Sequence, residues 1–210
     1  MFYPLFLDLK DRRVLVIGGG EVAERKVESL LAAGATVTVV APILNSALTK
    51  LADSKAVELR QRRFIESDLD GNLLVISATD DPAAQQQIAA AARERNILIN
   101  TVDQPQLCDF IVPAIVRKGY VVLAISTSGR SPALAAALRA KVDSLITDDA
   151  ARAARILGEV RSEVHSRFAD PGSRKKVFES IVASGIIDWI KECDDAAALE
   201  RVRAIIETLA

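Results

Sequence analysis

Short runs of apolar residues alternate with helix-like patterns along the first half of the chain. The runs are rich in Val, Ile and Leu and stop at glycine, proline or polar residues, which is typical of strands in a parallel sheet. The predicted strands are residues 13–18, 36–41, 57–63, 73–79 and 97–102. The predicted helices between them are residues 21–33, 44–53 and 82–94. This alternation predicts an α/β fold of the Rossmann type, a parallel sheet with helices on both faces.

The pattern changes after about residue 112. Residues 111–116 and 120–126 read as two strands joined by the short connection Arg117–Gly119. Ser131 and Pro132 then form a cap-and-proline signal that opens an Ala- and Leu-rich helix to about residue 146, and helical periodicity continues beyond residue 148. We therefore predict three parts, an α/β domain over 1–112, a small mixed segment over 113–147 and a helical C-terminal domain over 148–210.

The first predicted strand runs into a glycine-rich turn with the spacing G-x-G-x-x-A. Its residues are Gly18, Gly19, Gly20, Glu21, Val22 and Ala23. Gly18 allows a tight turn, Gly20 lets the backbone approach a pyrophosphate, and Ala23 lets the helix pack close to the strand. The helix N-terminus then offers amide donors to the phosphates. The strand–turn–helix context predicts dinucleotide binding, and the alternative is a glycine turn that binds nothing.

The end of the second predicted strand bears on the choice between NAD and NADP. An acidic residue there usually binds the adenosine ribose, and an arginine accommodates a 2′-phosphate. Residues 39–42 read Val-Val-Ala-Pro and provide neither group. Because no cation compensates an extra phosphate, the sequence favours NAD.

Polar residues follow the fourth and fifth predicted strands, where ligands of open α/β sheets bind. We expect Thr79, Asp80 and Asn100 to line the cofactor site, whereas Asp81 reads as a helix N-cap. Asp103 ends the fifth strand with no helix directly after it to cap. Its carboxylate is a candidate general base or metal-positioning group, and the alternative is a solvated turn aspartate.

Composition excludes several classes of protein. The 210 residues carry 27 Lys and Arg against 28 Asp and Glu, and half are hydrophobic, which argues against a disordered chain and against a uniformly basic nucleic-acid binder. Cys108 and Cys193 lie too far apart for a metal motif, so we expect free thiols in a reducing cytoplasm and no metal ligands. The single histidine, His165, reads as an exposed helix residue. No apolar run is long enough to cross a membrane and the N-terminus lacks the order of a signal peptide.

Charge is unevenly distributed along the chain. Residues 117–176 hold 12 basic and 6 acidic residues, whereas the remainder holds 15 basic and 22 acidic residues. Within the basic part, Arg130 directly precedes the predicted cap at Ser131. An arginine beside free helix amides suits a substrate carboxylate, and the alternative is a surface loop arginine. The near-zero total therefore leaves room for a cationic substrate site.

Several segments in this order resemble the precorrin-2 dehydrogenase/sirohydrochlorin ferrochelatase family of siroheme synthesis, which includes the N-terminal half of bifunctional siroheme synthase. The matching segments span the chain and are Pro4–Phe6, Val16–Gly20, Val22–Lys26, Ala78–Asp81, Asn100–Asp103, Phe110–Ala114 and Ile125–Pro132. The loop Ser128, Gly129, Arg130, Ser131 after the sheet makes the resemblance specific, because generic dinucleotide folds lack it.

The resemblance implies an enzyme that oxidises precorrin-2 to sirohydrochlorin with NAD⁺, and in many members inserts Fe²⁺ afterwards. It implies a catalytic role for Asp103, substrate binding by Ser128–Ser131, and a homodimer formed through residues 113–147. A serine that is phosphorylated in some members corresponds to Thr127 here. Because the chain ends at Ala210, we expect no fused methyltransferase half. The alternatives are a different NAD-dependent dehydrogenase and a nucleotide-sensing module without turnover.

Overall fold

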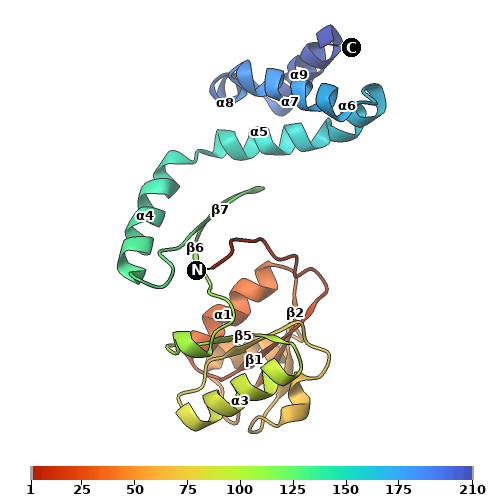
Figure 1. The fold of residues 1–210 in the computed structure, drawn as a ribbon. Coiled ribbons are helices and arrows are strands. Elements are labelled where there is room, and N and C mark those ends of the chain that lie inside the picture. Colours follow the sequence, from red (N-terminus) through yellow and green to blue (C-terminus); the bar gives the residue numbers. More distant parts are fainter. Residues whose placement is uncertain (1, 210) are drawn as a thin grey trace. The chain divides into compact units, whose positions relative to one another are not determined.

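The computed structural model describes residues 2–209 (Figure 1). Its contacts divide the chain into two compact units, Met1–Val112 and Pro113–Ala210. Each unit has a hydrophobic core of its own, so each is described by itself.

A five-stranded parallel sheet forms the centre of the first unit. Its strands are β1 (Arg13–Ile17), β2 (Thr36–Val40), β3 (Glu58–Arg60), β4 (Leu74–Ser77) and β5 (Leu98–Thr101). They lie in the order β3-β2-β1-β4-β5, so the chain reverses direction across the sheet between β1 and β4. Ile17 pairs with Val40 on one side and with Ser77 on the other, and Ser77 pairs with Thr101. The carboxyl ends of four strands therefore meet at one edge, where open α/β sheets bind ligands.

Helices cover both faces of this sheet. The helices are α1 (Glu21–Ala32), α2 (Ser46–Asp53) and α3 (Pro82–Glu94), and two 3₁₀ turns add η1 (Glu66–Leu69) and η2 (Pro105–Leu107). On one face, Ala23 and Val27 of α1 pack into a core with alternate residues of β1 and β2. On the other face, Ile88 of α3 packs with Leu15 and Val75. The α/β fold predicted from the sequence is confirmed.

Local signals set the helix boundaries. Asp81 caps α3, its side chain accepting hydrogen bonds from the amides of Ala83 and Ala84 at 2.9 and 3.2 Å. Gly34 follows α1 with φ +79°, a left-handed position that favours glycine. The second helix begins at Ser46 rather than near residue 44, because the side chain of Asn45 accepts from the Leu48 amide at 2.9 Å and caps the helix there.

A buried carboxylate closes the β3 edge of the sheet. Asp68, 1% exposed, accepts hydrogen bonds from Arg60 at 2.8 Å, from Arg62 at 2.6 and 2.7 Å, and from the Ile65 amide at 3.0 Å. Burial raises the pKa of Asp68, but these hydrogen bonds outweigh it and lower the pKa from 3.8 to about 2. The group therefore remains a carboxylate that holds two arginines in place.

The second unit begins with an antiparallel hairpin, β6 (Ala114–Lys118) and β7 (Val121–Ile125). The expected connection at Arg117–Gly119 is wrong by two residues at its start and one at its end: Lys118 pairs with Val121, so the turn consists of Gly119 and Tyr120. Gly119 has φ +54°, which lets a two-residue turn close the hairpin. Helix α4 (Pro132–Leu145) follows and packs on the hairpin, yet none of its residues is buried.

The C-terminal helices, from Asp148 to Leu209 and called the tail below, form a core of their own. Its elements are α5 (Asp148–Glu159), α6 (Arg161–Arg167), α7 (Pro171–Ala183), α8 (Ile186–Trp189), η3 (Ile190–Glu192) and α9 (Asp195–Leu209). Ile156, Ile181 and Ile206 meet at its centre. His165 is exposed on α6, as expected. No helix within residues 2–209 is long and apolar enough to cross a membrane.

Candidate active site

The glycine-rich turn lies between β1 and α1, and two of its glycines are required by the protein's own packing. Gly18 has φ +133°, and a Cβ atom there would lie 2.4 Å from the carbonyl oxygen of Ala78. A Cβ atom on Gly19 would lie 1.9 Å from the carbonyl oxygen of Ile43. No side chain fits at such distances, so Gly18 and Gly19 let the turn nest between the ends of β2 and β4.

Gly20 differs, because a Cβ atom there would meet no protein atom within 4 Å. Gly20 is also the N-cap of α1 and offers no side-chain acceptor to the first amides of the helix. In contrast, Asn45, Asp81 and Ser131 cap α2, α3 and α4 with their side chains. An open glycine before uncapped amides fits the pyrophosphate of a dinucleotide, which such a helix N-terminus attracts.

Asn45 holds this turn in place. Its backbone amide donates to the carbonyl of Gly19 at 2.8 Å, and its side-chain nitrogen donates to the carboxylate of Glu24 on α1 at 2.5 Å. One residue therefore ties the glycine turn, α1 and the start of α2 together.

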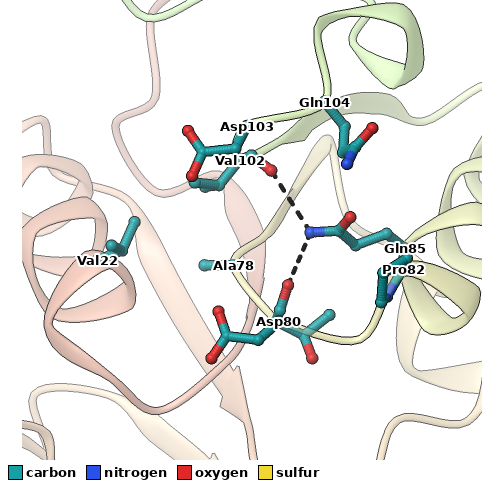
Figure 2. A pocket seen from close by; sticks show the side chains of 9 residues that line it. Val22, Ala78, Asp80, Pro82, Gln85, Val102, Asp103 and Gln104 are labelled. Atoms are coloured by element: carbon teal, nitrogen blue, oxygen red, sulfur yellow. Dashed lines mark hydrogen bonds between the residues drawn. The ribbon is translucent and has the colours of Figure 1, made fainter.

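A cavity of about 230 Å³ opens beside the turn, at the carboxyl edge of β4 and β5 (Figure 2). It is lined by Val22, Ala78, Thr79, Asp80, Pro82, Gln85, Val102, Asp103 and Gln104. The fold thus brings together residues from α1, from the loop after β4 and from the loop after β5. Val22, Thr79, Asp80 and Asp103, all singled out in the sequence, line the same cavity.

Asp103 has an unusual backbone conformation. Its φ is +59°, a left-handed position that non-glycine residues rarely adopt. Hydrogen bonds on both sides hold it there, from the Val102 amide to the Ser77 carbonyl at 2.9 Å and from the Gln104 amide to the Thr101 carbonyl at 3.3 Å. Its side chain is exposed at the cavity wall (Figure 2). The loop therefore presents a carboxylate on a fixed backbone.

Gln85 was not singled out in the sequence, although a signal existed. It lies three residues before the buried Ile88 on α3, so a polar residue occupies a core-facing position. Its side-chain nitrogen donates to the carbonyl of Thr79 at 2.7 Å and to the carbonyl of Val102 at 3.4 Å (Figure 2). Gln85 therefore links the two loops that carry Asp80 and Asp103.

Asn100 and Cys108 are not among the residues that line the cavity. Asn100 is 9% exposed, and its side-chain nitrogen donates to the Phe110 carbonyl at 2.9 Å. The Cys108 sulfur accepts from the Thr101 amide at 3.2 Å, and burial raises the pKa of the thiol. Both side chains brace the loop after β5, and Asn100 as a cofactor ligand stays a prediction.

The loop Ser128–Ser131 belongs to the second unit. Ser128 and Gly129 have φ values of +54° and +78°, and Ser131 caps α4 through the Leu134 amide at 3.2 Å. The Thr127 hydroxyl accepts from the Ser131 amide at 3.0 Å and donates to the Ser131 carbonyl at 3.1 Å. Thr127 is the residue that corresponds to the family serine, and its hydroxyl is therefore already hydrogen-bonded. Arg130 is exposed and makes no ion pair with any residue in 2–209.

Comparison with known proteins identifies the first unit. Residues 5–114, more than half of the chain, match the family described as "Putative NAD(P)-binding". The chain belongs to this NAD(P)-binding family. The family assignment agrees with the open glycine turn and supports a nicotinamide cofactor.

The chain also has long similarity to siroheme synthases. The siroheme synthase of Nitrosospira multiformis is 42% identical over 201 residues, 94% of this chain and 43% of that protein. The siroheme synthase of Thioalkalivibrio sulfidiphilus is 38% identical over 207 residues, 99% of this chain and 42% of that protein. The chain spans about two fifths of the length of these relatives.

A solved structure matches both units. It is SirC, a precorrin-2 dehydrogenase, with a TM-score of 0.72 and 25% identity over 99% of this chain and 98% of the other. The resemblance to the precorrin-2 dehydrogenase and siroheme synthase family is therefore confirmed. Within residues 2–209, no group of three His, Cys, Asp or Glu side chains is arranged to hold a metal ion.

Proposed function

We propose that this chain oxidises precorrin-2 to sirohydrochlorin with NAD⁺, in the synthesis of siroheme or a related tetrapyrrole. The observation that carries the proposal is the cavity that joins the dinucleotide turn to the Asp103 carboxylate. The similarity to siroheme synthases and to a precorrin-2 dehydrogenase supplies the substrate class.

Different residues of the first unit bind the cofactor and accept the proton. Gly20 and the first amides of α1 would hold the pyrophosphate of the dinucleotide, and Thr79 and Asp80, which line the cavity, would contact its nicotinamide part. When bound, NAD⁺ supplies the hydride acceptor for the macrocycle. Oxidation removes one hydride and one proton from precorrin-2, and Asp103 accepts the proton. Gln85 hydrogen-bonds to both loops and so keeps Asp80 and Asp103 at the same cavity.

The end of β2 favours NAD over NADP. Ala41 and Pro42 follow β2 and provide no cation for a 2′-phosphate. The nearest arginine along the β3 edge, Arg60, has its carbonyl 3.3 Å from the Ala41 amide, but its guanidinium is bound to Asp68. Arg62 is bound to the same carboxylate. Two cations of this edge are therefore already engaged, whereas the exposed Arg63 makes no ion pair with any residue in 2–209.

The second unit supplies substrate contacts and the dimer. Precorrin-2 carries eight carboxylates, and the exposed, unpaired Arg130 on the Ser128–Ser131 loop suits one of them. Helix α4 leaves Leu134, Leu138 and Leu145 exposed. An apolar helix face of this kind is covered in a homodimer, and residues 113–147 form that interface. Residues 1–112 bind NAD, and the helices from residue 148 onward pack around a core of their own within the second unit.

Ferrous iron insertion into sirohydrochlorin is the second activity to test. Asp80 and Asp103 open onto one cavity, and carboxylate oxygens bind Fe²⁺ only weakly when alone. In such a reaction the tetrapyrrole nitrogens hold most of the iron as substrate, and the carboxylates take up the protons that leave them. The free thiols Cys108 and Cys193 fit a reducing cytoplasm as the location of both reactions.

An anaerobic assay tests the main proposal. The purified chain is mixed with precorrin-2 and NAD⁺, and the absorbance of sirohydrochlorin is followed. Asp103→Asn should lower the rate by about 100-fold or more, because general-base catalysis contributes about 10²–10⁴-fold, while NAD⁺ binding is retained. Asp81→Asn, which preserves the cap of α3, serves as the matched control and should react normally.

Each alternative has its own outcome in this assay. NAD⁺ binding without any sirohydrochlorin would support a nucleotide-sensing module and contradict the proposal. Full activity of Asp103→Asn would remove this residue from the mechanism. Adding Fe²⁺ after complete oxidation then tests metal insertion separately.

A further inference from the structure

The cavity has a charge that does not suit its proposed substrate. Two of its nine lining residues, Asp80 and Asp103, carry carboxylates, and none of the nine is basic. A tetrapyrrole with eight carboxylates is repelled by such a lining unless a cation lies close by.

Helix α1 presents three distinct sides. Ala23, Val27 and Leu30 face the sheet and are buried. Glu24 faces the β2 side, where it accepts a hydrogen bond from Asn45. Val22 faces the cavity. Residues four positions apart lie one above the other on a helix, so Lys26 follows Val22 on the cavity side.

The direction of the helix lets the Lys26 side chain extend toward the cavity, whose lining on this helix is Val22. Helical side chains tilt toward the helix N-terminus and cover the turn that precedes their own Cα atom. Because α1 starts at the cavity edge of the sheet, the turn that Lys26 covers is the one that contains Val22. The four-carbon stem of lysine is long enough to carry its ammonium beyond that turn.

Lys26 is also an unsatisfied cation. It is half-buried, and its ammonium makes no hydrogen bond or ion pair with any residue in 2–209. Burial, and then the nearby Arg25, lower the pKa of its ammonium. Other partly shielded cations of this unit are paired, Arg60 with Asp68 and Arg95 with Glu66. An ammonium removed from water without a counter-ion is unfavourable, and an anionic ligand would relieve it.

From this geometry we infer that Lys26 binds a carboxylate of the tetrapyrrole at the α1 side of the cavity. The inference rests on the proposed function and adds a specific contact to it. The pyrophosphate of the dinucleotide is a less suitable partner, because the open Gly20 and the free amides of α1 already serve it at the helix end. Lys26 therefore orients the substrate against the cofactor and compensates the two aspartates.

Three variants test this contact. Lys26→Met keeps the length of the side chain and removes its charge, and Lys26→Arg keeps the charge. Lys50→Met, an exposed lysine on α2, is the matched control. Binding of sirohydrochlorin to the protein without cofactor is followed by its absorbance change, NAD⁺ binding is measured by calorimetry, and kinetics with precorrin-2 give KM and kcat.

We expect Lys26→Met to weaken sirohydrochlorin binding and to raise KM for precorrin-2 by about tenfold or more, as is usual for loss of a charge-assisted hydrogen bond. The NAD⁺ dissociation constant should stay unchanged, the melting temperature should stay the same or rise because an unpaired charge is removed, and the salt dependence of sirohydrochlorin binding should become shallower. Lys26→Arg should restore binding to within about threefold, and Lys50→Met should behave as the unaltered protein.

The other outcomes separate the hypotheses. Unchanged sirohydrochlorin binding in Lys26→Met would overturn the inference, as would a selective loss of NAD⁺ affinity, which would assign Lys26 to the pyrophosphate. An unaltered chain that binds sirohydrochlorin but does not oxidise precorrin-2 would contradict the proposed function alone. If Lys26→Met melts at a lower temperature, the Lys26→Arg variant decides, because it keeps a positive charge on a long side chain: sirohydrochlorin binding within about threefold of the unaltered chain supports the contact, and a larger loss overturns it.

Discussion

The first unit, which contains the sheet, and the hairpin–helix segment of the second unit differ in how far they bury the apolar side chains of their helices. In the sheet unit, helices α1, α2 and α3 all contribute fully buried side chains. In the hairpin and α4, over residues 114–145, Val116 is the one buried side chain, although the segment is rich in Val, Leu and Ala. The sheet unit completes its core within one copy of the chain, whereas the apolar face of α4 stays open.

This difference indicates where each region does its work. A complete core gives a rigid edge on which the glycine turn and Asp103 keep fixed positions. An apolar helix face that a single copy of the chain leaves exposed is available to pack against the surface of another protein molecule. Stability is therefore expected to come from the sheet unit and the tail, and assembly from residues 114–145.

The largest expected difference in stability is between two leucine variants, one on α2 and one on α4. Leu48→Ala on α2 removes a fully buried side chain and should lower the free energy of unfolding of the sheet unit by about 3 kcal/mol, because it leaves a cavity. Leu138→Ala on α4, where the side chain is 39% exposed, should lower it by less than about 1 kcal/mol in dilute protein. Urea unfolding of both variants checks this, and equal losses would break the comparison.

A second pair compares buried and exposed carboxylates. The folded-state pKa of Asp68 is about 2, below its ordinary value of 3.8, so its stabilisation is present above about pH 4. As the pH falls from about 4 to 2, the carboxylate is protonated and about 2 kcal/mol of stability is lost. Asp68→Asn should remove this pH dependence, as measured by urea unfolding at several pH values.

The matched control is Asp143→Asn on α4. Asp143 is half exposed and lies 4.0 Å from Lys118, so its loss should change stability by less than about 0.5 kcal/mol. A pH profile of Asp68→Asn that follows the unaltered chain between pH 4 and 2 would contradict this assignment.

The glycine turn allows a test in which stability and binding separate. Gly19→Ala places a Cβ atom against the Ile43 carbonyl and should cost about 1–2 kcal/mol of stability. Gly20→Ala meets open space and has an ordinary φ of −91°, so its melting temperature should stay nearly unchanged. Its NAD⁺ affinity should fall by about tenfold, because the methyl group occupies the pyrophosphate's approach. Calorimetry and thermal unfolding of both variants provide the measurements.

The smallest effect on stability is expected on the open face of α4. Leu138→Lys should change the free energy of unfolding of dilute protein by less than about 0.5 kcal/mol, since the side chain is partly exposed. It should nevertheless shift the protein from dimer to monomer in sedimentation experiments. Val182→Lys, on an exposed position of α7, is the control and should leave association unchanged. A dimer that tolerates Leu138→Lys would exclude this face as the interface.

Much of the fold and part of the site could be predicted from local patterns. The strands of the sheet and the caps at Asp81 and Ser131 depend on neighbouring residues, so the sequence indicates them directly. The hairpin turn was misplaced because Arg117 and Lys118 are polar enough for a turn, yet both pair with β7. Cross-strand register decides such cases, and register is not a local property.

The division between sequence and tertiary structure is clearest around the cavity. The spacing G-x-G-x-x-A between a strand and a helix determined the dinucleotide turn, because backbone freedom and helix amides are local properties. Only the tertiary structure separated Gly19, which avoids the Ile43 carbonyl, from Gly20, which faces open space. It also decided that Gln85 joins two loops and that Lys26 has no partner in the described chain. Such roles depend on groups distant in sequence that meet only when parallel strands end at one edge.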